Sequence, residues 1–246
     1  MRCMHARRLA LCVLLLAASA CSLRTVGCGV PAPPPVDTTA AAPDDTGGSD
    51  PSGAGGTRIV FLGDSLTAGL GLLTQQAYPH LIQEMFAAEG YQEVEAINAG
   101  ISGDTSAGGA RRVEGVLDAN TKILVVALGA NDALRGLTVE QTYQHLTAIL
   151  ATANSRGVAV MLCGMEAPIN YGEDYRISFR GVFQRLLRDH QGTISFVPFL
   201  LEGVAGNPSL NQADGIHPNT AGARVIAEAL YPKLRTLVDQ LGNGGG

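Results

Sequence analysis

Five short runs of apolar residues recur along the chain, and longer stretches with helical spacing of apolar residues separate them. Such runs, rich in Ile, Val and Leu, are typical of strands that are buried on both faces of a sheet. The predicted strands span 58–62, 93–98, 122–128, 158–163 and 194–198. The predicted helices lie near 78–89, 107–118, 138–155, 176–190 and 219–241. Because strands alternate with helices, we expect one parallel sheet with right-handed crossovers and helices on both faces.

The composition fits a single globular domain. Hydrophobic residues make up 46% of the 246 residues and charged residues 16%, so the chain can bury one sizeable core. We predict a domain over 57–242 and a flexible tail at 243–246. The formal net charge is -5 and the domain has no basic block, which argues against nucleic acid as a partner. We expect a monomer that acts on a small molecule.

The cysteines lie mostly outside the predicted domain. Four of the five occur within the first 28 residues, and only Cys163 falls within the domain. A disulfide framework inside the domain is therefore excluded, and no Cys/His cluster suggests a metal site. Since Cys163 ends the apolar run at 158–163, we expect a buried and chemically inert thiol.

The first 20 residues resemble a secretory signal peptide. Arginines precede an apolar stretch at 9–18, and the small residues at 18–20 form a cleavage site. Cys21 follows directly, as in the bacterial lipobox, in which the cysteine is acylated; Ala18 stands where that pattern usually has Leu. A lipoprotein anchored to the membrane through Cys21 and a soluble exported protein therefore stay open as alternatives.

Residues 21–56 are rich in Pro, Gly, Ser and Thr. A segment of this composition cannot bury enough apolar surface to fold, so we predict a disordered tether. Together with the signal peptide, this tether predicts a periplasmic protein or a membrane-anchored lipoprotein of the bacterial envelope.

Polar, glycine-rich segments follow four of the predicted strands, at 63–67, 98–105, 129–132 and 214–218. The carboxyl ends of parallel strands share one edge of a sheet, which is where open α/β folds place their ligand sites. We therefore expect the four segments to converge on one site.

These segments supply the residue types of serine acyl transfer. Ser65 is the candidate nucleophile, because a serine hydroxyl becomes reactive when a base lies within hydrogen-bond reach. His217 is the candidate base, and Asp214, three residues earlier, can hold one ring nitrogen and fix the tautomer. The backbone N–H groups of Ser65 and Gly103 and the side-chain amide of Asn131 are candidate donors to the oxyanion of a tetrahedral intermediate.

Each segment taken alone also has a purely structural explanation. Gly103 can serve a left-handed turn. Asn131 and Asp132 can cap a helix at its N-terminus, and His217 with Pro218 can cap the last helix. However, five residues of types suited to serine acyl transfer all stand near predicted strand ends. Taken together, they favour a functional site over five separate structural roles.

The ordered set of motifs resembles the four signature blocks of the SGNH (GDSL) hydrolases. The blocks are Gly63-Asp64-Ser65-Leu66, Gly103, Gly129-Ala130-Asn131-Asp132 and Asp214-Gly215-Ile216-His217. The similarity spans 58–240 and is closest to the bacterial arylesterase and multifunctional acyl-CoA thioesterase I / lysophospholipase L1 group. It implies an α/β fold, a three-layer α/β/α sandwich around a five-stranded parallel sheet (flavodoxin-like), and no metal or organic cofactor. By this resemblance Ser65, Asp214 and His217 are catalytic, and Ser65, Gly103 and Asn131 form the oxyanion hole.

The resemblance implies an exported serine esterase for aryl or acyl esters, with lysophospholipase and acyl thioesterase activity as further expectations. Two alternatives stay open: a polysaccharide O-acetyl deacetylase with the same machinery, and a non-catalytic envelope binding module. A complete Ser, His and Asp set argues against the binding module, which has no need of a base-paired serine. We expect the acyl site among the loops after the strands, which include Leu134, Ile169, Tyr171 and 199–201.

Overall fold

A computed structural model of the chain describes residues 56–243. The predicted signal peptide, Cys21 and the predicted tether up to residue 55 lie outside the described residues, as does the segment 244–246. None of the helices within 56–243 is both long enough and apolar enough to cross a membrane.

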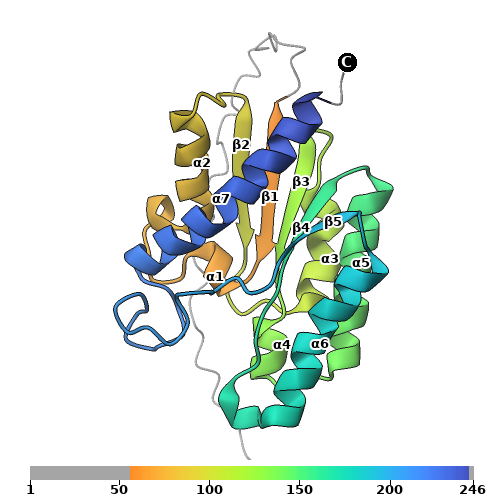
Figure 1. Ribbon diagram of the computed structural model, residues 1–246, viewed down its shortest axis with the longest axis vertical. Coiled ribbons are helices and arrows are strands. Elements are labelled where there is room, and N and C mark those ends of the chain that lie inside the picture. The colour runs from red at the N-terminus through yellow and green to blue at the C-terminus, as the bar shows by residue number, and fades with distance from the viewer. Residues whose placement is uncertain (1–55, 244–246) are drawn as a thin grey trace, which may run out of the picture. The chain divides into compact units, whose positions relative to one another are not determined.

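The predicted parallel sheet is confirmed. Its five strands are hydrogen-bonded in the order β2-β1-β3-β4-β5, and each neighbouring pair is parallel (Figure 1). The strands are β1 (Thr57–Gly63), β2 (Val94–Gly100), β3 (Thr121–Ala127), β4 (Ala159–Cys163) and β5 (Ile194–Val197). The apolar runs of β1 and β3 are fully buried because these strands lie inside the sheet, whereas the edge strand β2 is only partly covered.

Five longer helices cover the two faces of the sheet. Helices α2 (Tyr78–Ala88) and α7 (Thr220–Asn243) pack against each other on one face (Figure 1). Helices α3 (Ser106–Val116), α5 (Val139–Ser155) and α6 (Glu173–Asp189) form the layer on the other face. The core is the apolar surface between these layers, and it includes the fully buried Cys163. Burial raises the pKa of its thiol to about 12, which agrees with the expected inert packing.

Two short helices that the apolar spacing did not predict begin directly after the central strands. They are α1 (Ser65–Ala68), after β1, and α4 (Ala130–Leu134), after β3. Helices of four and five residues are too short to show helical periodicity in a sequence. Two 3₁₀ turns, η1 (Thr74–Gln76) and η2 (Ile169–Tyr171), complete the assigned helices of the described chain.

Neither of the helix caps that the sequence left open is used. Gly129, in the left-handed region at φ 117°, is the N-cap residue of α4, so Asn131 and Asp132 lie inside its first turn. The side chain of Asn219 accepts hydrogen bonds from the first turn of α7, which leaves His217 outside that helix. The side chains of Asn131, Asp132 and His217 are therefore available for other contacts.

Candidate active site

Ser65 is the first residue of α1 and stands at the carboxyl end of β1. The turn that presents it is tight, because a Cβ atom at Gly63 would lie only 1.9 Å from Oγ1 of Thr67. That same Oγ1 is hydrogen-bonded to the buried hydroxyl of Tyr78 at 2.8 Å, which anchors α1 to α2. Glycine at position 63 therefore lets the strand turn sharply into the helix and brings Ser65 to the sheet edge.

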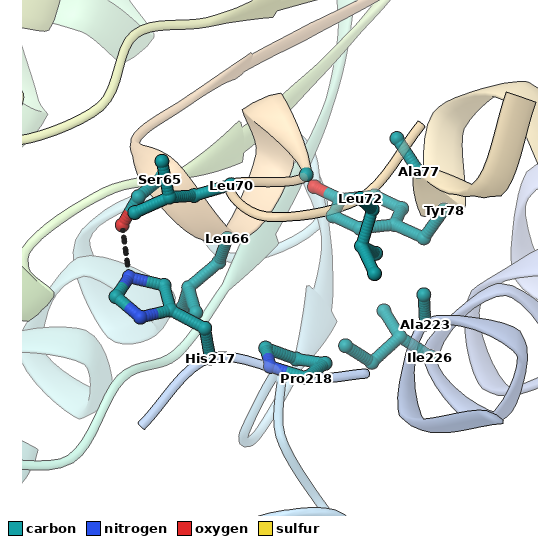
Figure 2. A pocket seen from close by; sticks show the side chains of 11 residues that line it. Ser65, Leu66, Leu70, Leu72, Ala77, Tyr78, His217, Pro218, Ala223 and Ile226 are labelled. Carbon is teal, nitrogen blue, oxygen red and sulfur yellow. Dashed lines mark hydrogen bonds between the residues drawn. The ribbon is translucent and has the colours of Figure 1, made fainter. Parts of the chain in front are cut away.

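His217 lies against Ser65 although 152 positions separate them in the sequence. The Ser65 Oγ and His217 Nε2 atoms are 2.9 Å apart (Figure 2). On the other side of the ring, His217 Nδ1 lies 2.6 Å from Oδ2 of Asp214. A carboxylate accepts only, so Nδ1 carries the proton and donates, and Nε2 is left to accept the Ser65 hydroxyl proton.

Asp214 is held in its ionised form by the loop around it. Its Oδ1 atom accepts the backbone N–H groups of Ile216 at 2.9 Å and of His217 at 3.0 Å. Hydrogen bonds lower the pKa of Asp214 to about 2. The largest effect comes from the backbone N–H of His217, followed by the His217 ring and the N–H of Ile216. This carboxylate therefore stays charged near neutral pH, as an orienting group for the imidazole must.

Gln212, which the sequence reasoning missed, holds the histidine loop in place. Its backbone N–H donates to the His217 carbonyl at 2.8 Å, and its side-chain amide donates to the carbonyls of Leu70 at 2.7 Å and Pro218 at 2.9 Å. One glutamine thus joins the His217 loop to the segment that follows the Ser65 helix. A single glutamine in a loop has no pattern that could have revealed this contact.

Gly103 follows β2 and Asn131 follows β3, the two strands that flank β1 in the sheet. Gly103 has φ 79°, so the left-handed turn considered as its structural role is present. Its carbonyl accepts a hydrogen bond from Nη2 of Arg135 at 2.6 Å, and Arg135 is the residue that directly follows α4. Asn131, on α4, donates its side-chain amide to Oδ2 of Asp64 at 3.1 Å. Helix α4 therefore contacts both the Gly103 loop and the turn that carries Ser65.

Asp64 is a buried carboxyl group to which the sequence reasoning assigned no role. It is fully buried beside the nucleophile position, and its other oxygen accepts the N–H of Leu66 at 3.0 Å. Burial raises the pKa of Asp64 to about 6, even though the hydrogen bonds from Leu66 and Asn131 act in the opposite direction. Its position directly before Ser65 was the only signal in the sequence.

A second group of Ser, His and Asp side chains lies nearby but has a different geometry. Asp132 accepts the backbone N–H and the hydroxyl of Ser106, at 2.8 and 2.5 Å, and the hydroxyl of Thr142 at 3.3 Å. The Ser106 hydroxyl is also 3.2 Å from Nδ1 of His145. Ser106 is fully buried and the carboxylate contacts the serine rather than the histidine, so this group joins helices α3, α4 and α5 instead of meeting a substrate.

Three of the six residues predicted for the acyl site are exposed. The side chains of Leu134, Ile169 and Tyr171 are 42%, 82% and 37% exposed, and the Tyr171 hydroxyl donates to the Leu134 carbonyl at 2.5 Å. In the segment 199–201, Leu200 is buried in the core, and Phe199 and Leu201 are partly buried. Figure 2 shows a cavity beside Ser65 between α1, α2 and α7, but its volume is about 10 Å³, room for about one water.

No group of three or more His, Cys, Asp or Glu side chains within 56–243 is placed to hold a metal ion.

Sequence comparison agrees with this geometry. The sequence pattern of the GDSL-like Lipase/Acylhydrolase family matches residues 61–225, which include Ser65, Gly103, Asn131, Asp214 and His217. The chain belongs to this family. The resemblance expected from the motifs is thereby confirmed.

Two relatives within the GDSL-like family carry names that describe an activity. Esterase TesA of Pseudomonas aeruginosa is 40% identical over 181 residues, which cover 73% of this chain and 89% of the relative. Thioesterase 1/protease 1/lysophospholipase L1 of Escherichia coli (strain K12) is 33% identical over 182 residues, which cover 74% of this chain and 85% of the relative.

The GDSL-like fold is also seen in a solved structure. The crystal structure of TesA, 40% identical in sequence, superimposes with a TM-score of 0.68 and covers 74% of this chain and 99% of the other. The expected three-layer sandwich around a five-stranded parallel sheet is confirmed.

Proposed function

We propose that this protein is an exported serine esterase that hydrolyses carboxylic esters through an acyl-enzyme. The observation that carries the proposal is the continuous series of hydrogen bonds from the Ser65 hydroxyl through the His217 ring to the Asp214 carboxylate. The names of the relatives, esterase and thioesterase/lysophospholipase, point to the same class of reaction.

In the first half-reaction Ser65 Oγ attacks the ester carbonyl carbon while His217 Nε2 takes its proton. The imidazolium formed is stabilised by Asp214 and then protonates the leaving alcohol or thiol, so the acyl group remains on Ser65. In the second half-reaction His217 takes a proton from water, and the hydroxide equivalent attacks the acyl-enzyme. Collapse of this intermediate releases the carboxylic acid and returns the proton to Ser65.

The proposed oxyanion hole combines two backbone N–H groups and one side-chain amide. The N–H of Ser65 is the first of helix α1 and has no acceptor within the helix. Gly103 supplies the second N–H and Asn131 Nδ2 the third donor. Loss of one such donor typically costs about 3–4 kcal/mol of transition-state stabilisation.

The test is hydrolysis of p-nitrophenyl esters by the full chain and by Ser65→Ala. We expect the substitution to lower the turnover rate more than about 10³-fold and to leave the circular dichroism spectrum unchanged. Ser106→Ala is the matched control, since Ser106 also contacts a histidine and an aspartate but is buried, and it should retain turnover. Activity retained by folded Ser65→Ala would disprove the assignment of the nucleophile.

An acyl-chain-length series separates this function from the deacetylase alternative. Activity that continues from acetate to butyrate, octanoate and palmitate supports an esterase, whereas activity on acetate alone would indicate a deacetylase. The same assay with a lysophospholipid and an acyl-CoA places the enzyme among the activities named for its relatives.

The proposal of export rests on the sequence of residues 1–21. Fractionation of bacteria that express the full chain should place the mature protein in the envelope. If Cys21 is acylated, Cys21→Ala moves the protein from the membrane to the soluble fraction. A cytoplasmic, uncleaved protein would contradict export.

A further inference from the structure

Arg112 joins three segments that meet at the candidate active site. It lies on helix α3, and its guanidinium donates from three different nitrogen atoms. Nη2 donates to the carbonyl of Gly63 at 2.9 Å, Nη1 donates to the carbonyl of Ala99 at 2.7 Å, and Nε donates to Oδ2 of Asp104 at 2.8 Å. The first two acceptors are at the carboxyl ends of β1 and β2.

The acceptors lie next to the residues on which the proposed chemistry depends. Gly63 is two residues before Ser65, and Asp104 directly follows Gly103. The N–H of Ser65 belongs to the turn from β1 into α1 and that of Gly103 to the loop after β2, and Arg112 is bonded to both segments. We propose that Arg112 is a positioning residue for ester hydrolysis, which sets the separation of these two oxyanion donors; this inference rests on the proposed function.

The surroundings of Arg112 are built to hold one geometry. The side chains of Arg112 and Asp104 are only 19% and 12% exposed, so their ion pair is largely shielded from water. The other carboxylate oxygen of Asp104 accepts the N–H of Thr105 at 3.0 Å. A Cβ atom at Gly108 would lie 1.6 Å from that oxygen, so the helix can accommodate the carboxylate only with glycine at this position.

The chemistry of the three bonds requires a guanidinium. Its N–H groups form a rigid, planar fork, so three acceptors in different directions can be bound at the same time. A lysine ammonium keeps the charge but is a single point on a flexible stem, and it cannot span the Gly63 and Ala99 carbonyls together with Asp104. The substitution Arg112→Lys therefore removes the geometry and retains the charge.

The effect of Arg112 should appear in kcat and not in KM. Oxyanion donors act on the charge that develops in the transition state, and a displacement of about 1 Å can cost on the order of 10²-fold in rate. The bound ester has not yet developed this charge, so its ground-state binding is little affected.

The experiment measures kcat, KM and melting temperature of the full chain with a p-nitrophenyl ester, for the unmodified protein, Arg112→Lys and two controls. Arg156→Lys is the matched control, since Arg156 also bonds a carbonyl, that of Leu117 at 2.9 Å, and a carboxylate, but at the opposite end of α3. Arg111→Lys is the second control, because Arg111 is an exposed arginine next to Arg112 on the same helix.

We expect Arg112→Lys to lower kcat by about 10- to 100-fold with KM within about threefold. Both controls should stay within about twofold in kcat. An unchanged kcat in Arg112→Lys, or an equal loss in Arg156→Lys, would overturn the positioning role while leaving Ser65-dependent hydrolysis intact. Failure of the proposed function is seen separately, as turnover that survives Ser65→Ala.

Asp104→Asn decides the matter if Arg112→Lys does not fold. It removes the charge and one of the two acceptor oxygens of residue 104, while both guanidinium–carbonyl bonds stay in place, so only the contact of Arg112 with the Gly103 loop is weakened. A fall in kcat of at least about fivefold with unchanged KM supports the role of Arg112, and an unchanged kcat refutes it.

Discussion

Replacement of Asp64 by asparagine is expected to alter both the pH dependence of stability and the rate of ester hydrolysis. The buried carboxylate accepts one N–H with each oxygen, from Leu66 and from the Asn131 amide. An asparagine at this position offers only one acceptor oxygen. Either the Leu66 N–H of the helix that carries Ser65 or the Asn131 amide must then face a second N–H donor, so one of the two proposed catalytic groups loses a supporting hydrogen bond.

The size of the stability effect follows from the pKa of Asp64. Burial raises this pKa from its ordinary value of 3.8 to about 6, which corresponds to about 3 kcal/mol between the protonated and ionised carboxyl in the folded protein. The folded protein holds this proton more tightly than the unfolded chain, so the contribution to stability is present at low pH and is lost as the pH rises through about 6. Between pH 4.5 and pH 8 the unmodified protein should lose about 2 kcal/mol that Asp64→Asn does not lose.

The assay is urea unfolding of both proteins at pH 4.5 and pH 8, combined with kcat at pH 8. Other groups titrate equally in the two proteins, so the change in their stability difference isolates Asp64. We expect kcat of Asp64→Asn to fall by about 10- to 100-fold, and that of the exposed Asp189→Asn to stay unchanged. A stability difference independent of pH would refute the perturbed carboxyl, and an unchanged kcat would refute the orienting role.

Three further predictions concern the carboxylates of Asp214 and Asp132. Asp214→Asn should lower kcat by about 10²–10⁴-fold, because an amide no longer selects the tautomer with a proton on Nδ1; the melting temperature should change little, since this side chain is 45% exposed, and retained kcat would contradict the orienting role. Because the pKa of Asp214 is lowered to about 2, this group stays ionised between pH 4 and pH 9. Its titration should therefore cause no change in the reaction rate within that pH range. Asp132→Asn should lower the free energy of unfolding by about 2–3 kcal/mol in urea denaturation, because a Ser106 donor is left without an acceptor in a buried site; unfolding at an unchanged urea concentration would contradict this.

The main elements of the fold could be read from local patterns. The strands β1 and β3 are continuous apolar runs because both of their faces are covered, and the long helices have one apolar stripe each. The short helices α1 and α4 were missed because four or five residues contain too little periodicity to detect. Both begin at glycine-containing turns where the chain leaves a central strand, and both carry proposed catalytic groups.

The candidate nucleophile, base and oxyanion donors were predicted from the sequence because each stands in a polar segment after a strand, and parallel strands bring those segments to one edge. Residue types and chain order alone therefore indicated Ser65, Gly103, Asn131, Asp214 and His217. Their distances were not predictable, since 152 positions separate the two atoms of the Ser65–His217 hydrogen bond.

Tertiary structure decided which ordinary polar residues hold the site together. Asp64, Arg112 and Gln212 resemble many surface residues in a sequence, and their partners come from other elements. Burial then determines their chemistry: the same carboxyl group has a pKa of about 6 at Asp64, where water is excluded, and of about 2 at Asp214, where N–H donors surround it. Desolvation and long-range hydrogen bonding arise only when the chain has folded, so the residue types were predictable from the sequence while their protonation and alignment depended on the packed structure.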